Sequence, residues 1–289
     1  MTDWKKPDLG DMTSLADFLA REEYRCVTLS EHMTRRFSLG GATARAKFGG
    51  SGLCWLHHGE AQEGSAEITV DGAVFVDSNA ASWCLLPREG GEIADLARRF
   101  VASSRLASLS GPGEDVTRLC ALFGRPPLAE RHYDLMKAKA GIPTPSKSAG
   151  VEIRRASMRD IAALCSLHGA YEEEELPKAL RFRLPSLPER MVGLLRRQVV
   201  VLAFMDGRAV GKANTNARGL RTDQLGGIYV RPEARNKGVG TLMVSGLSAI
   251  LRDESRGICL YVRPDNRSAK RMYAKLGFVD AGSYAAYHF

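Results

Sequence analysis

A short apolar strand that runs into a glycine-rich turn and then into a helix most constrains how this chain can fold. Leu225–Val230 is apolar and ends in β-branched and aromatic residues, which is typical of a buried strand. Pro232 ends this strand because proline has no N–H to donate to a ladder. Beyond the turn Arg235–Gly240, apolar residues recur at spacings of three and four from Val239 to Leu251, which predicts an amphipathic helix.

The turn has the properties of an anion site. The first N–H groups of a helix have no partner within the helix and carry the positive end of its dipole. Gly238 and Gly240 have no Cβ to keep a pyrophosphate from this backbone, and Arg235 and Lys237 add positive charge. The spacing matches neither a P-loop nor a dinucleotide fingerprint, and alone it is equally typical of a plain glycine-rich turn.

A second segment has the same strand-to-helix order. Residues 257–264 predict another apolar strand. Asn266 after it is a good helix N-cap, and Ala269 and Tyr273 fall on one side of the helix that follows. Gly277 stands where a left-handed glycine commonly ends a helix.

The two segments together, strand–RxxGxG–helix–strand–NxxAxxxYxxxGF, resemble the GCN5-related N-acetyltransferases (GNAT), which bind acyl-coenzyme A. The resemblance covers residues 151–289. It implies an α/β (α+β) domain with a mixed, mostly antiparallel central sheet flanked by helices. Before the first segment we expect a strand at Val151–Arg155, helices at 158–168 and 186–197, and a hairpin across Asp206-Gly207.

The resemblance also implies a site for acetyl-CoA. The pantetheine arm is expected between the strand ending at Val230 and the strand Gly257–Val262, and the pyrophosphate at the turn. The residues implied to bind the coenzyme are Ile228, Tyr229, Val230, Arg235, Asn236, Lys237, Gly238, Val239, Gly240, Thr241, Asn266 and Tyr273. Tyr273 matches the tyrosine of the family that donates a proton to the coenzyme sulfur, although a tyrosine on an amphipathic helix is also typical of a core.

No single residue is predicted as the general base. Relatives that acetylate protein N-termini carry a glutamate in the strand before the Asn motif, and Tyr261 takes its place here, which counts against that specificity. The remaining candidates are Asp223, Glu233 and the run Glu172–Glu175. This run is either a solvated helix end or an acidic wall that attracts a cationic amine.

Residues 1–140 form a predicted α/β domain, followed by a linker at 141–150 that is rich in Pro, Gly and Ser. The expected helices are 12–25, 91–104 and 114–123, and the expected strands are Cys26–Leu29, 52–57, 66–70, 73–77, 106–110 and 132–137, with a hairpin at Asp71-Gly72. Residues 37–53 are expected to be a loop. The order of elements resembles tandem acetyltransferases whose first half is a degenerate GNAT-like domain.

Composition narrows the classes of function. The formal net charge is +8, but the basic residues are dispersed without aromatic interleaving, which argues against a nucleic-acid partner. No apolar run reaches the length of a membrane span and the N-terminus lacks a signal-peptide core, so we expect a cytoplasmic protein. The six cysteines form no C-x-x-C pair, so neither a metal site nor a disulfide framework is expected.

The leading hypothesis is an N-acyltransferase that transfers acetyl from acetyl-CoA to a primary amine by direct attack in a ternary complex. The alternative is a regulatory or sensor protein that binds coenzyme A without efficient turnover. The sequence does not identify the acceptor amine. It also leaves open whether the first domain closes the acceptor cleft or mediates homodimerisation.

Overall fold

The computed structural model describes residues 4–37, 52–59, 69–88, 93–102, 106–138, 142–143, 150–176, 181, 185–251 and 256–289. Most of the predicted loop at 37–53 and of the predicted linker at 141–150, and residues 66–68 of a predicted strand, lie outside these ranges. The division into domains at 140 and 150 therefore stays a prediction.

The first half contains β1 (Trp4–Lys5), α1 (Met12–Glu22), η1 (Glu23–Arg25), α2 (Val27–Phe37), β2 (Gly52–His58), β3 (Val70–Asp77), β4 (Ala81–Leu85), α3 (Ile93–Ala102), β5 (Ser108–Pro112), α4 (Gly113–Cys120) and β6 (Ala129–Ala138). The second half contains β7 (Glu152–Arg155), η2 (Met158–Asp160), α5 (Ile161–Glu175), α7 (Leu187–Arg197), β8 (Val200–Met205), β9 (Arg208–Arg218), β10 (Thr222–Val230), η3 (Pro232–Ala234), α8 (Val239–Ile250), β11 (Gly257–Val262), α9 (Arg267–Lys275) and β12 (Phe278–His288).

The described strands form one sheet in the order β1-β2-β3-β4-β5-β12-β6-β11-β10-β9-β8-β7. Two neighbouring pairs, β4 with β5 and β10 with β11, are parallel, and the other described pairs are antiparallel. The predicted fold class, a mixed and mostly antiparallel sheet with flanking helices, is confirmed.

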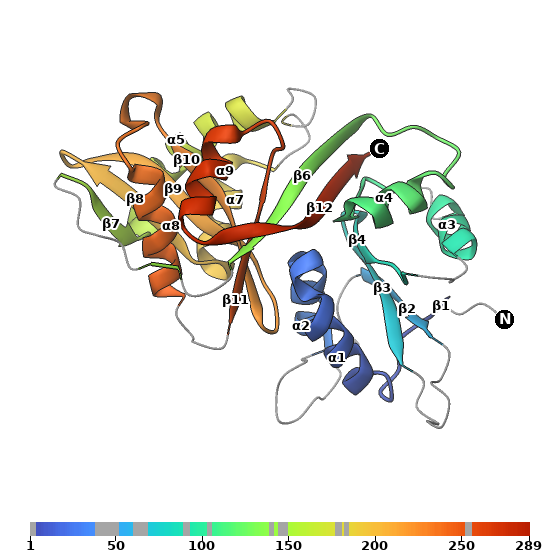
Figure 1. Cartoon of the computed structure of the whole chain (residues 1–289). Coiled ribbons are helices and arrows are strands. Elements are labelled where there is room, and N and C mark those ends of the chain that lie inside the picture. The colour runs from blue at the N-terminus through green and yellow to red at the C-terminus, as the bar shows by residue number, and fades with distance from the viewer. Residues whose placement is uncertain are drawn as a thin grey trace.

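The two halves exchange strands at the centre of this sheet. Strand β6 of the first half lies between β11 and β12, while β12 of the second half lies between β5 and β6. Figure 1 shows β6 and β12 running side by side between the two halves. Each half therefore completes its part of the hydrogen-bond ladder with a strand from the other half.

Helices cover both faces of each half because successive side chains of a strand point to opposite faces. In β8, Val201 packs in the cluster that contains α8, while Val200 packs with α5 and α7. In β2, Leu56 packs with α1 and α2, and its neighbour Trp55 packs with α3 and α4. The apolar clusters between the helices and the sheet are the cores that stabilise the fold. Figure 1 shows how the helices are arranged around the strands.

The predicted strand at Cys26–Leu29 is wrong, because Val27–Phe37 is the helix α2. Leu29, Met33 and Phe37 recur every four residues and are all buried against β2 and β3. The β-branched start of the segment suggested a strand, but the longer helical period decides its structure.

The predicted hairpin at Asp71-Gly72 is also wrong, because β3 runs through both residues from Val70 to Asp77. A Cβ on Gly72 would lie 2.8 Å from the Pro87 side chain and 2.9 Å from the His57 Cβ. Glycine is thus required here by close packing within a strand and not by a turn. The hairpin at Asp206-Gly207 does form, with positive φ at both residues.

Because the halves share one ladder, the chain should unfold in a single transition. Leu135 on β6 is 1% exposed, and its strand pairs with both β11 and β12. We expect Leu135→Ala to lower the free energy of unfolding by about 2–5 kcal/mol, while Leu122→Ala, at an exposed position, changes it by less than about 0.5 kcal/mol. Denaturant unfolding followed by fluorescence and circular dichroism measures both, and separate transitions for the two halves would contradict the shared sheet.

Candidate functional site

The site begins where β10 and β11 part. The two parallel strands pair only from Thr222 with Gly257 to Leu225 with Leu260. Beyond these residues β10 continues along β9 to Val230, and β11 continues along β6 to Val262. A cavity of about 900 Å³ lies at this opening, lined by both strands, by the start of α8, by α9 and by the end of α5.

The first turn of α8 faces this cavity. Gly238 is the N-cap residue and has φ +76°, a left-handed conformation that glycine adopts without strain. A Cβ on Gly238 would meet no heavy atom of the protein within 4 Å, so the space in front of this backbone is open. The N–H groups of Val239, Gly240 and Thr241 have no partner within the helix, and these residues line the cavity. The turn therefore has the geometry of an anion-binding site.

The structure brings nearly all the predicted coenzyme residues together. The residues of that set that line the cavity are Ile228, Tyr229, Val230, Arg235, Asn236, Gly238, Val239, Gly240, Thr241, Asn266 and Tyr273. Lys237 is exposed and does not line the cavity. Arg235 lines the cavity with its guanidinium bound to both carboxylate oxygens of Glu174 at 2.7 Å.

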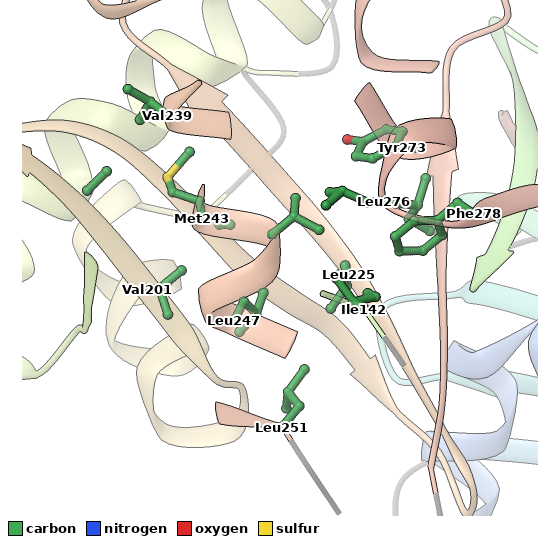
Figure 2. Close-up of a cluster of buried hydrophobic side chains, with 14 of the residues drawn as sticks. Ile142, Val201, Leu225, Val239, Met243, Leu247, Leu251, Tyr273, Leu276 and Phe278 are labelled. Carbon is green, nitrogen blue, oxygen red and sulfur yellow. The ribbon is translucent and has the colours of Figure 1, made fainter. Parts of the chain in front are cut away.

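Helix α9 has the predicted ends. The Asn266 Oδ1 accepts a hydrogen bond from the Ala269 N–H at 3.0 Å, which confirms the N-cap, and Gly277 has φ +89°. Tyr273 packs edge-on against Phe278, with ring centroids 5.8 Å apart. Figure 2 shows both side chains in one buried cluster. Burial raises the pKa of Tyr273, and nearby Tyr171 and Glu175 raise it further. The phenol therefore stays protonated at neutral pH and can donate a proton.

The four glutamates at the end of α5 have different environments. Glu172 is buried, forms an ion pair with Arg190 and lies 3.4 Å from the neutral His168 ring. Glu173 is exposed, and Glu174 is bound to Arg235. The prediction of a uniformly solvated helix end therefore does not describe this run.

Glu175, the last residue of this run, lines the cavity without a short ion pair. Its Oε2 lies 3.6 Å from Arg263 and 3.9 Å from Arg131. These are longer than direct charge-assisted hydrogen bonds, so the carboxylate keeps acceptor capacity. It is also one of the charged groups that act on Tyr273.

The other candidate bases lie elsewhere. Asp223 is fully buried and forms ion pairs with Arg256 at 2.8 Å and Arg218 at 3.2 Å. Glu233 is an exposed residue of η3. Neither residue lines the cavity.

Sequence reasoning missed the aromatic residues that line the cavity beside Tyr273. Tyr133 comes from β6 of the first half, and Tyr171 comes from α5. No local pattern in the sequence connects Tyr133 to the second half, since that contact depends on the strand exchange.

Lys212 on β9 was also not predicted from the sequence. Its side chain is fully buried, and Nζ donates hydrogen bonds to the Gly227 carbonyl at 2.7 Å and to Asn214 Oδ1 at 3.2 Å. Nζ also lies 4.9 Å from the centroid of the Tyr171 ring. Burial lowers the pKa of Lys212 to about 7, while Glu172 acts in the opposite direction. Polar residues at every second position, Lys212, Asn214 and Asn216, were the available signal of a polar strand face.

Within the described ranges there is no group of three or more His, Cys, Asp or Glu residues that could hold a metal ion. In the same part of the chain, no helix has both the length and the apolar character to cross a membrane.

Comparison with known proteins agrees with this geometry. Residues 161–278 match the family described as acetyltransferase (GNAT). These residues belong to the GNAT family. The matched range contains β10, α8, β11 and α9, and so nearly all of the cavity.

A mycothiol acetyltransferase from Acidimicrobium ferrooxidans is 38% identical over 84 residues, which cover 27% of this chain and 27% of the relative. The match thus spans about a quarter of the length of that relative. A solved Drosophila protein aligns over 100% of this chain and 99% of its own, with TM-score 0.66 and 14% identity.

A tandem GNAT protein from the clavulanic acid biosynthesis pathway aligns over 98% of this chain and 97% of its own, with TM-score 0.57 and 16% identity. At these identities the likeness concerns the fold alone. The fold of this tandem protein is therefore shared along nearly the whole chain, as the order of the elements predicted.

The buried Lys212 should make stability depend on pH. Its pKa is about 7 in the folded protein and near 10.5 when unfolded, so between these values the unfolded chain binds one proton more. Stability should therefore rise with pH in this window by up to about 1.4 kcal/mol per pH unit, relative to Lys212→Met. Chemical denaturation at pH 6 to 9 measures the difference, and Lys5→Met, at an exposed position, should show none. Parallel curves for wild type and Lys212→Met would contradict the shifted pKa.

Proposed function

We propose that this protein transfers an acetyl group from acetyl-CoA to a primary amine. The observation that carries the proposal is the convergence of three features on one cavity. These are the open first turn of α8, the parted strands β10 and β11, and the protonated phenol of Tyr273. The proposal also rests on the family match over 161–278.

The residues present fit acetyl-CoA in size and in chemistry. The pyrophosphate would be held by the N–H groups at the start of α8, where no side chain obstructs the approach. Arg267, Arg271 and Lys275 of α9 also line the cavity and give its rim positive charge for the nucleotide phosphates. Past Leu225 the backbone of β10 has no pairing with β11, so it can bond the pantetheine amides.

Two side chains would move the protons. The acceptor amine must lose a proton to attack, and Glu175 lines the cavity with acceptor capacity to take that proton. The departing sulfur gains from a proton, which Tyr273 is able to donate. The name of the Acidimicrobium relative supports acetyl as the transferred group. Glu175 adds negative charge to the cavity wall, which favours a cationic amine as acceptor.

The coenzyme site is tested by Gly238→Val. A β-branched side chain at φ +76° would stand in front of the helix N-terminus and should abolish binding of acetyl-CoA. The strained backbone should also cost about 1–3 kcal/mol of stability. Calorimetric titration of acetyl-CoA measures the binding, with wild type expected near micromolar affinity, about −8 kcal/mol.

Gly124→Val is the matched control. Gly124 has φ +67°, its Cβ position is also open, and it lies beyond α4 in the first half. This variant should lose similar stability and bind acetyl-CoA as wild type does. Normal binding by Gly238→Val would show that the pyrophosphate site lies elsewhere.

The proton-transfer roles are tested by Tyr273→Phe and Glu175→Gln. Each should reduce the release of free coenzyme A in the presence of amines by roughly 10²-fold at pH 7, with little change in acetyl-CoA affinity. Glu175→Gln should recover activity at higher pH, because the amine then loses its proton to solvent, whereas Tyr273→Phe should not. Tyr287→Phe on β12, outside the cavity, is the control for loss of a phenol.

Unchanged turnover in either variant would remove that residue from the mechanism. Binding of acetyl-CoA by wild type without turnover on any amine would instead favour the coenzyme-binding sensor.

A further inference from the structure

Strand β10 bends away from its regular pairing inside the cavity. Gly226 pairs with Asn214 and Tyr229 pairs with Lys212, so β10 advances three residues while β9 advances two. Such an extra residue is a β-bulge. Gly227 within it has φ +54°, and Gly226, Gly227, Ile228 and Tyr229 all line the cavity. The bulge therefore shapes the wall along which the parted strand runs.

The side chain of Lys212 fastens this bulge from the opposite strand. Its Nζ donates to the Gly227 carbonyl at 2.7 Å and to Asn214 Oδ1 at 3.2 Å. In a trans peptide the carbonyl and the following N–H point in opposite directions. The bond to Gly227 therefore fixes the direction of the Ile228 N–H, which points away from Lys212.

Burying the Lys212 amine costs desolvation free energy, which a role of filling space alone does not explain. The side chain is completely buried, and the charge that acts on it is that of Glu172, which is itself paired with Arg190. The neutral rings of His168 and Tyr171 lie on the same helix as Glu172. An apolar side chain of similar length would fill the same volume without the desolvation of an amine. Such an apolar side chain could not donate the hydrogen bond that Lys212 gives to the Gly227 carbonyl.

We propose that Lys212 is a positioning residue that holds the β10 bulge in the shape that receives the pantetheine arm of acetyl-CoA. This inference rests on the proposed function. It assigns to Lys212 an action through the backbone of Gly227 and Ile228, without contact between Lys212 and the coenzyme. The anion-binding turn at α8 is formed by other residues and does not depend on it.

The test separates the two ends of the coenzyme. Acetyl-CoA and adenosine 3′,5′-bisphosphate, which lacks the pantetheine arm, are titrated into wild type and Lys212→Met. We expect Lys212→Met to bind acetyl-CoA at least tenfold more weakly and to bind the nucleotide with unchanged affinity. Lys5→Met, an exposed change outside the cavity, should bind both ligands as wild type does.

A second variant reaches the same contact from β10. A Cβ on Gly227 would lie 2.7 Å from the Lys212 Nζ and would also overlap Asn214 Oδ1. Gly227→Ala should therefore displace the Lys212 ammonium from the Gly227 carbonyl while the lysine itself is kept. It should reproduce the selective loss of acetyl-CoA affinity, and it decides the question if Lys212→Met does not fold.

Equal weakening of both ligands would overturn the inference, because a general structural role affects both ends alike. Unchanged binding of acetyl-CoA by the two variants would also overturn it, while leaving the proposed function standing. Failure of wild type to bind either ligand would instead overturn the proposed function, and the inference with it.

Discussion

The parting of β10 from β11 after Leu225 and Leu260 is the constraint on which the rest of the site depends. A sheet that opens in its interior leaves backbone N–H and C=O groups without strand partners, and such groups need a partner from elsewhere. The bulge at Gly227 keeps β10 turned from its neighbour, and α8 presents the unpaired N–H groups of its first turn to the same space. Backbone geometry, more than side-chain chemistry, therefore makes this cavity suited to a long polyanionic coenzyme.

The first half supports this opening. Strand β6 pairs with β11 from Cys259 to Val262, so the wall opposite β10 is held by a strand from the other half, which also carries Tyr133 into the cavity. The corresponding parallel pair of the first half, β4 with β5, is held close. A Cβ on Gly111 would lie 2.5 Å from the Cys84 carbonyl, and Asp115 accepts a hydrogen bond from the Leu86 N–H at 3.0 Å. Through the strand exchange, β6 of the first half thus holds one wall of the cavity in the second half.

The sequence predicted what is encoded over short distances and missed what depends on long-range pairing. The Asn266 cap, the left-handed Gly277 and the open turn at Gly238 follow from residue types at fixed spacings. The contribution of Tyr133 and the burial of Lys212 follow from which strands lie side by side, and a local pattern does not carry that information. The error at Cys26–Leu29 has another cause, because a short β-branched window hid a helical period that continues to Phe37.

The most direct measurement is a crystal structure of the protein with acetyl-CoA. The account predicts the pyrophosphate at the N–H groups that follow Gly238, the pantetheine arm along β10 between Gly226 and Val230, and the thioester sulfur beside the Tyr273 hydroxyl. The Lys212 bond to the Gly227 carbonyl should be unchanged in the complex. A coenzyme bound outside this cavity, or one whose sulfur lies far from Tyr273, would contradict the account.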